Sequence, residues 1–225
     1  LASRDAQRYW DPALGGHASQ LDTFRRVVEL DEQDWRTVAD TCRHLDVAFL
    51  ATPFDLEAVD LLERLDAAAY KIASGDITYR PLIEKIAATG RPVFLSTGAA
   101  TGREIDRAMK WRKNTDVVVP MACDLVYPCP PQHADLATQI PLLRRRTVNV
   151  GYSDHTRQVV TGAVAVTLGA RVLEKHVTLN PDGQAPDDRM ALDVDGAMEY
   201  RALAEQAATL CANVTGDPQA AARVG

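Results

Sequence analysis

The chain has 225 residues, of which 46% are apolar and 25% charged, and its formal net charge at pH 7 is -6. The length fits one large domain better than two small ones, and the composition is ordinary for a soluble globular protein. The negative charge argues against nucleic acid or an anionic membrane as the main partner. The longest apolar runs, such as residues 159–168, are too short to cross a bilayer.

The cysteines bear on the compartment of the protein. They are widely scattered and form neither a CxxC pair nor a small disulfide framework, so a reducing, cytoplasmic compartment is expected. No secretory signal opens the chain, which begins with Leu1 rather than Met, so its natural start can lie upstream. The four cysteines are Cys42, Cys123, Cys129 and Cys211.

Local signals predict the first elements. Residues 1–20 are polar and predict a loop or an arm, and residues 21–30 could form one short helix. Asp31 can cap the next helix. In that helix the apolar residues of the range 35–42 share one face at helical spacing, and the helix is expected to end near His44.

Further along, short apolar runs alternate with amphipathic stretches. The runs recur about every 22 to 31 residues, which is the spacing of strand, helix, strand units in a parallel sheet. The predicted strands are residues 47–51, 69–73, 92–96, 116–120, 147–152 and 171–177. The predicted helices are residues 56–65, 80–88, 103–112, 134–144, 159–168 and 196–212.

This alternation limits the fold class to α/β. Six mostly apolar strands, buried on both faces, fit a (β/α)8 TIM barrel or an open doubly wound sheet. No G-x-G-x-x-G follows a strand, which lowers the case for a dinucleotide-binding sheet. Two helix starts are well marked, by Thr101 with Glu104 and by Asp193. Because no Pro/Ser-rich linker interrupts the chain, a single domain over residues 1–225 is expected.

Polar side chains gather at the carboxyl ends of the predicted strands. In a barrel these ends share one mouth, where the chemistry takes place. Lys71 stands out because an ammonium group in an apolar strand is costly to bury unless an anion meets it. With the nearby hydroxyls it would make a cradle for phosphate and carboxylate groups. The polar residues at the strand ends are Thr52, Lys71, Ser74, Asp76, Ser96, Thr97, Tyr127, Ser153, His155, Glu174 and His176.

Purely structural explanations also exist for these residues. A Ser or Thr can form a turn at a strand end, Lys71 can extend past the rim, and Asp76 can cap a helix. His155 and His176, which end two consecutive strands, could together hold a divalent metal. Each His could instead be only a polar residue that leaves a strand, and spacing alone leaves both explanations open.

Seven short segments form a further pattern. They are Ala51–Phe54, Tyr70–Asp76, Leu95–Gly98, Tyr127–Pro128, Gly151–Thr156, Glu174–His176 and Pro186–Asp187. Together they resemble the sialic acid synthase family, in the family's order and over nearly all of residues 31–215. Members condense phosphoenolpyruvate with an N-acyl hexosamine to a nine-carbon 2-keto acid. The resemblance implies a (β/α)8 barrel and a transferase of carbohydrate biosynthesis.

The resemblance also implies a substrate site. The residues that match phosphoenolpyruvate-binding positions are Thr52, Lys71, Ser74, Ser96 and Ser153. Tyr127 and Asp187 match residues that touch the amino sugar. The second substrate would be the open-chain aldehyde form of an N-acetylmannosamine-like sugar.

The same resemblance implies a metal and a set of catalytic residues. His155 and His176 match the two ligands of a divalent cation, Mn²⁺ or Mg²⁺. Many members carry Glu at the position of Asp76. An acidic role is still expected for Asp76, although its side chain is shorter than that of Glu. The residues expected to take part in catalysis are Lys71, Asp76, His155, Glu174 and His176.

The implied reaction is attack of phosphoenolpyruvate C3 on the sugar aldehyde, followed by addition of water at C2 and loss of phosphate. The metal would polarise the aldehyde oxygen and help to orient the water. Lys71 would offset the charge of the phosphate group.

Two parts of the family pattern are absent. Members begin with two further strands, and most continue into a small antifreeze-like domain that reaches the partner subunit's site, so a homodimer is expected. A barrel without its first two strands would expose unpaired sheet edges. We therefore expect either that this chain belongs to a longer protein or that another chain supplies the strands.

Two other functions remain open. The chain could be an inactive barrel fragment that acts as a binding module, although it keeps the residues for the metal and the anion. It could also be another phosphoenolpyruvate-dependent aldol-type synthase, but the segments Gly151–Thr156 and Glu174–His176 argue against this. The identity of the hexosamine, and whether it is phosphorylated, cannot be read from the sequence.

Overall fold

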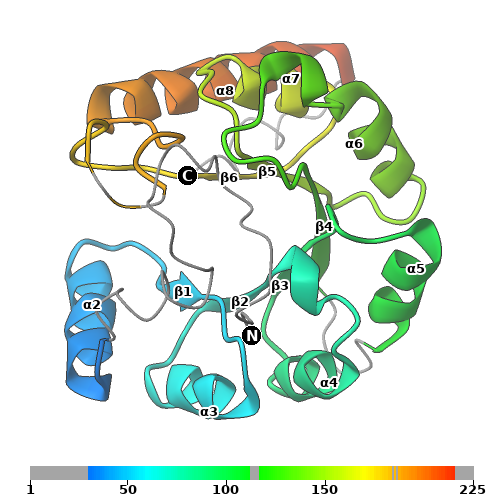
Figure 1. Cartoon of the computed structure of the whole chain (residues 1–225). Helices are drawn as coiled ribbons and strands as arrows, with labels where there is room; N and C mark the ends of the chain where they lie inside the picture. The colour runs from blue at the N-terminus through cyan, green and yellow to red at the C-terminus, as the bar shows by residue number, and fades with distance from the viewer. Residues whose placement is uncertain (1–29, 112–116, 184, 186, 216–225) are drawn as a thin grey trace, which may run out of the picture. The chain divides into compact units, whose positions relative to one another are not determined.

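The computed structural model describes residues 30–111, 117–183, 185 and 187–215 (Figure 1). The described chain divides into two compact units, one up to residue 119 and the other from residue 120 onward. The predicted loop and short helix before residue 30 lie outside the described residues, as does Pro186. The single domain over residues 1–225 stays a prediction.

Among its described residues the first unit contains three complete strands, four α-helices and one 3-10 helix. Strand β1 pairs with β2 and β2 pairs with β3, in both cases parallel, with Lys71 opposite Phe94 in the register. In Figure 1 helices α3 and α4 lie on one side of these strands. The elements are α2 (Glu32–His44), β1 (Leu50–Ala51), α3 (Leu56–Arg64), β2 (Ala69–Ile72), the 3-10 helix η2 (Ser74–Asp76), α4 (Arg80–Ala88), β3 (Val93–Ser96) and α5 (Gly102–Trp111).

Strand β4 (Val118–Cys123) begins in the first unit and ends in the second. In the second unit β4 pairs with β5 and β5 pairs with β6, again parallel. Helices α6, α7 and α8 lie on one side of β5 and β6 (Figure 1). The elements of this unit are η3 (Pro131–His133), α6 (Leu136–Arg144), β5 (Gly151–Asp154), α7 (Thr161–Thr167), β6 (Val172–Lys175) and α8 (Val194–Thr215).

The core of each unit lies between its strands and its helices. In the first unit β2 is buried along its whole length, and Leu82 and Ile86 of α4 are completely buried. In the second unit helix α7 packs on α8, where Gly162 meets the ring of Tyr200 so closely that an added Cβ would lie 2.5 Å from Tyr200 Cζ. None of the described helices is long and apolar enough to span a membrane.

The α/β prediction is confirmed, with six strands in the predicted places and in the predicted alternation with helices. The predicted caps are also present: Asp31 Oδ1 accepts from Asp34 N at 2.9 Å, and Thr101 N donates to Glu104 Oε2 at 2.7 Å. The fifth strand is shorter than predicted. It begins only at Gly151, because the Thr147 hydroxyl accepts a hydrogen bond from Asn149 N and holds a turn there.

Candidate functional site

In the first unit, polar side chains lie at the ends of the two neighbouring strands β2 and β3. Lys71 is a residue of β2 and is 8% exposed, with its Nζ 3.4 Å from the Ile72 carbonyl oxygen. Ser74 follows β2, and its Oγ accepts a hydrogen bond from Gly98 N at 3.0 Å. Ser96 ends β3 and is buried. The parallel pairing of β2 and β3 therefore brings an ammonium group and two hydroxyls to the same end of this sheet.

The hydroxyl of Ser96 is the unusual group in this set. Its Oγ is buried and has no hydrogen-bond partner among the described residues. A buried polar atom without a partner costs free energy, so native proteins rarely keep one without a ligand or another special reason. This position is therefore suited to an anion that accepts the missing hydrogen bond.

Two further predicted residues lie in the first unit. Thr52 follows β1 directly and is half-buried. Asp76 ends η2 and is also half-buried, and this burial raises the pKa of its carboxyl group. The idea that Asp76 caps a helix is wrong for α4, whose cap residue is Tyr79 and has no side-chain cap. Ionisation of the Asp76 carboxyl group in the folded protein therefore costs free energy.

In the second unit, His155 follows β5 and is 5% exposed. Its Nδ1 lies 2.6 Å from the carbonyl oxygen of Asp124, which can only accept, so Nδ1 carries the proton and donates. Nε2 then carries the lone pair and lies 3.4 Å from Ser153 Oγ. This tautomer leaves Nε2 as the ring nitrogen that can bind a cation.

Three more predicted residues lie near His155 or His176. The ring centroids of His155 and His176 are 5.6 Å apart, and the Tyr127 ring lies against His155 at 4.1 Å. His176 Nδ1 is 3.5 Å from Asp187 Oδ2. The second unit therefore brings Tyr127, His155, His176 and Asp187 together, and their roles toward a metal and a sugar stay predictions.

The donor set of the two histidines fits a metal. A histidine that ligates a metal commonly donates its other ring N–H to a backbone carbonyl or a carboxylate. His155 has such a partner in the Asp124 carbonyl, and His176 Nδ1 lies within ion-pair distance of the Asp187 carboxylate. Within the described ranges, no group of three or more His, Cys, Asp or Glu side chains is gathered as a metal site.

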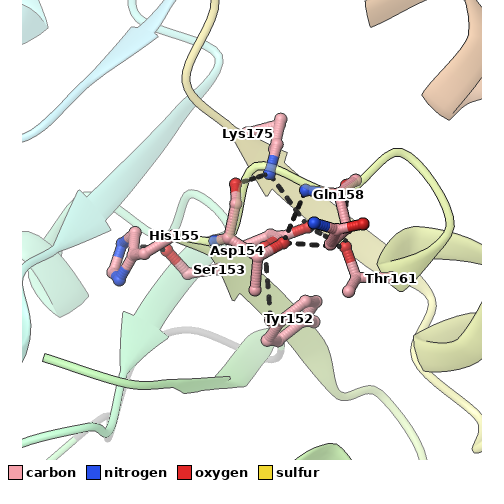
Figure 2. A network of polar contacts seen from close by, with 8 residues as sticks. Tyr152, Ser153, Asp154, His155, Gln158, Thr161 and Lys175 are labelled. Carbon is pink, nitrogen blue, oxygen red and sulfur yellow. Dashed lines mark hydrogen bonds and ion pairs between the residues drawn. The ribbon is translucent and has the colours of Figure 1, made fainter. Parts of the chain in front are cut away.

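A buried polar network lies beside His155 and is centred on Asp154, which is 1% exposed (Figure 2). Asp154 Oδ1 accepts from Thr156 N at 2.8 Å and from the Tyr152 hydroxyl at 3.3 Å. Asp154 Oδ2 accepts from the Thr161 hydroxyl and lies 3.2 Å from Lys175 Nζ. Both carboxylate oxygens are thus occupied by donors from β5, α7 and β6.

Lys175 is the cationic member of this network. Its side chain is 7% exposed, and its Nζ also donates to the Thr156 carbonyl oxygen and lies 5.5 Å from the centre of the Tyr200 ring. Burial lowers the pKa of Lys175, and the nearby Asp154 carboxylate opposes that shift. Sequence reasoning missed both residues, although each directly precedes a predicted metal ligand. Glu174, which it did select, is half-buried and pairs with Ser153 in the register.

The comparisons with known proteins give the family. A model of the NeuB family matches residues 1–216. The chain belongs to the NeuB family. Its NeuB-type relatives include the N,N'-diacetyllegionaminic acid synthase of Campylobacter jejuni, which is 37% identical over 179 residues, or 78% of this chain and 53% of that protein. The pseudaminic acid synthase of Helicobacter pylori is 38% identical over 156 residues, or 68% of this chain and 46% of that protein.

A solved structure of a sialic acid synthetase is also similar. The sialic acid synthetase of Leptospira borgpetersenii, crystallised with citrate, has a TM-score of 0.77 and 27% identity and covers 81% of this chain and 65% of its own. The predicted resemblance to sialic acid synthases is therefore confirmed. The chain spans about half the length of the two NeuB-family relatives named above.

Proposed function

We propose that the protein is a phosphoenolpyruvate-dependent synthase that condenses phosphoenolpyruvate with an N-acyl hexosamine to a nine-carbon 2-keto sugar acid, with release of phosphate. The observation that carries this proposal is the grouping of Tyr127, His155, His176 and Asp187 in a chain of the NeuB family. The names of the relatives support the reaction class, because they are synthases of pseudaminic and legionaminic acids.

In this proposal the first unit binds the anionic substrate. Lys71 supplies positive charge to the phosphate group, and the hydroxyls of Thr52, Ser74 and Ser96 donate hydrogen bonds. The Oγ of Ser96 has no partner in the described part of the chain, which supports the assignment because an anion would accept its hydrogen bond. Ser153 of the second unit is assigned to phosphoenolpyruvate by the resemblance alone.

The second unit supplies the metal ligands and the sugar contacts. We propose that His155 Nε2 and His176 hold a divalent cation, which when bound supplies polarisation of the aldehyde oxygen. Between the two candidates, Mn²⁺ fits imidazole nitrogen better than Mg²⁺, which prefers oxygen ligands. Tyr127 and Asp187 orient the sugar beside these rings.

The reaction needs proton transfer as well as stabilisation of negative charge. The C3 carbon of phosphoenolpyruvate forms a bond to the aldehyde carbon, whose oxygen takes up a proton, and water adds at C2 and loses a proton. The C2–O bond to phosphate breaks and leaves the 2-keto acid. Asp76 and Glu174 are the candidate proton carriers, and the raised pKa of Asp76 suits a group that both takes and gives a proton.

We also propose that the six described strands belong to a (β/α)8 barrel. The parallel pairing of neighbouring strands, with a helix after each strand, supports this proposal. The homodimer and the cytoplasmic location stay predictions. The relatives named above are synthases of different sugar acids by their names, so the identity of the sugar must come from experiment.

The proposal predicts sugar-dependent release of phosphate from phosphoenolpyruvate. The purified protein is incubated with Mn²⁺ and a panel of N-acyl hexosamines, and phosphate is measured with time. His155→Ala should abolish release. The matched control is His44→Ala, because His44 Nδ1 also lies 2.8 Å from a backbone carbonyl oxygen, that of Asp40, but on the exposed face of α2.

The control variant should keep the wild-type rate. No sugar-dependent release from the folded wild type would instead favour the binding-module function. Equal rates in wild type and His155→Ala would show that His155 has no part in the chemistry.

A further inference from the structure

The buried pair of Asp154 and Lys175 lies directly before the two histidines in the chain. Asp154 and Lys175 face each other in the register of β5 and β6. One residue further along each strand come His155 and His176, whose rings are 5.6 Å apart. The ion pair therefore joins the two strands at the last position before the rings.

The pair and the rings project from opposite faces of the strands. Successive side chains of a strand alternate between faces, so Ser153 and His155 share one face and Asp154 projects from the other. The 3.4 Å separation of Ser153 Oγ from His155 Nε2 agrees with this alternation. Figure 2 shows His155 and Ser153 on one side of Asp154, with Lys175 and Thr161 away from them. The Asp154–Lys175 pair thus lies on the face of the strands opposite the two histidine rings.

The pair is fixed by helices as well as by strands. Thr161, which donates to Asp154, begins α7, and Tyr200, whose ring lies beside the Lys175 ammonium, belongs to α8. Lys175 also donates to the Thr156 carbonyl, one residue beyond His155. A shift of either strand end would break several of these contacts at once.

We propose that Asp154 and Lys175 are positioning residues that set the spacing of His155 and His176 and so the affinity for the cation between them. This inference rests on the proposed metal site of the previous section. A buried ion pair is weak evidence for stability, because apolar residues of similar volume often stabilise a fold as well or better. Its contacts to two strand ends and two helices instead favour a role in geometry.

The test is the affinity for Mn²⁺, measured from the paramagnetic resonance signal of the unbound ion. Lys175→Met leaves the Asp154 charge buried and unpaired, which endangers folding. The double variant Asp154→Asn, Lys175→Met removes both charges together and is therefore the main test. Its dissociation constant for Mn²⁺ should rise about 10- to 100-fold, as for other residues that orient metal ligands. Circular dichroism establishes that each variant is folded.

A second variant leaves the pair in place. Thr161→Val removes one donor to Asp154 from α7 and should weaken Mn²⁺ binding to a smaller extent. The matched control is Lys85→Met, because Lys85 likewise pairs with a carboxylate, Asp60 at 2.7 Å, and donates to a backbone carbonyl, that of Leu56. Lys85→Met should leave the Mn²⁺ affinity unchanged even where it lowers the melting temperature.

The outcomes separate the two proposals. If wild type binds Mn²⁺, His155→Ala abolishes binding and the folded double variant binds as tightly as wild type, the positioning inference is overturned and the metal site stands. If wild type binds no Mn²⁺, the metal site itself fails and the positioning inference fails with it. Weaker binding in the double variant, with unchanged binding in Lys85→Met, supports both.

Discussion

At the scale of single residues, two serines at neighbouring strand ends differ in one respect. Ser74 Oγ accepts a hydrogen bond from Gly98 N, whereas Ser96 Oγ is buried with no partner among the described residues. Ser74 therefore stabilises the loop after β3 in the absence of substrate. An anionic ligand would give Ser96 Oγ a partner, so removal of the two hydroxyls should have different effects on stability.

Ser96→Ala should leave the free energy of unfolding unchanged or raise it by up to about 1 kcal/mol, because it removes an unsatisfied hydroxyl. Ser74→Ala should lower it by about 1 kcal/mol, because the Gly98 amide loses its acceptor. Ser96→Ala should also raise KM for phosphoenolpyruvate by about tenfold, the loss of one hydrogen bond to an anion. Urea denaturation and steady-state kinetics measure these effects. If Ser96→Ala lost stability and kept its KM, the hydroxyl would be structural.

Asp76 gives a prediction about pH. Burial raises the pKa of this carboxyl group in the folded protein. A raised pKa means that the folded state binds the proton more tightly, so ionisation at neutral pH lowers stability, and this cost disappears as the pH falls through the raised pKa. Asp76→Asn should therefore raise the melting temperature at pH 7, by up to about 2 °C, and the difference should shrink toward about pH 4.

The control for Asp76 is Glu32, a carboxylate whose pKa is shifted in the opposite direction. A hydrogen bond from Arg64 lowers the pKa of Glu32, so Glu32→Gln should lower the melting temperature at pH 7, and the loss should fade as the pH drops. Thermal melts over this pH range measure both variants. A fall in melting temperature for Asp76→Asn at pH 7 would show that the charge of Asp76 has a stabilising partner.

At the scale of elements, the contact of α7 with α8 lies behind the histidine site. Gly162 of α7 lies against the Tyr200 ring, and that ring lies 5.5 Å from the Lys175 ammonium. The absence of a side chain at position 162 allows this close approach. The packing of these helices is therefore continuous with the network that holds the ends of β5 and β6.

Gly162→Ala should destabilise the protein, because its Cβ would lie 2.5 Å from Tyr200 Cζ. Overpacking of this kind costs about 1 to 3 kcal/mol, which lowers the melting temperature by roughly 2 to 4 °C per kcal/mol in a protein of this size. The control is Gly75→Ala, because no atom lies within 4 Å of a Cβ added there. Calorimetry compares the two variants, and an equal loss in both would contradict the packing explanation.

At the scale of the whole molecule, the parts that the sequence predicts correctly are those coded by local patterns. The helix from Glu32 to His44 follows from the Asp31 cap and its apolar face, and both are set by residues close in sequence. The predicted start of β5, at Thr147, was wrong. The apolar pattern before Gly151 does not reveal the turn that the Thr147 hydroxyl holds.

In the candidate site too, the sequence predicts only what local patterns determine. His155 and His176 could be selected from residue type and position at strand ends. The partner of His155 Nδ1 could not be predicted from the sequence. It is a backbone carbonyl 31 positions away, and any residue type supplies such a carbonyl. Asp154 and Lys175 lie within the segments Gly151–Thr156 and Glu174–His176, but their pairing depends on the register of β5 and β6, which only the structure fixes.

The central claim is that this protein forms a carbon–carbon bond between phosphoenolpyruvate and an amino sugar. The most direct measurement is mass spectrometry of the products made from phosphoenolpyruvate labelled at C3 with a heavy carbon isotope. We expect one product that contains both the label and the sugar, formed in equal amount with free phosphate and absent with His155→Ala. Labelled pyruvate and phosphate, without any product that contains the sugar, would contradict it.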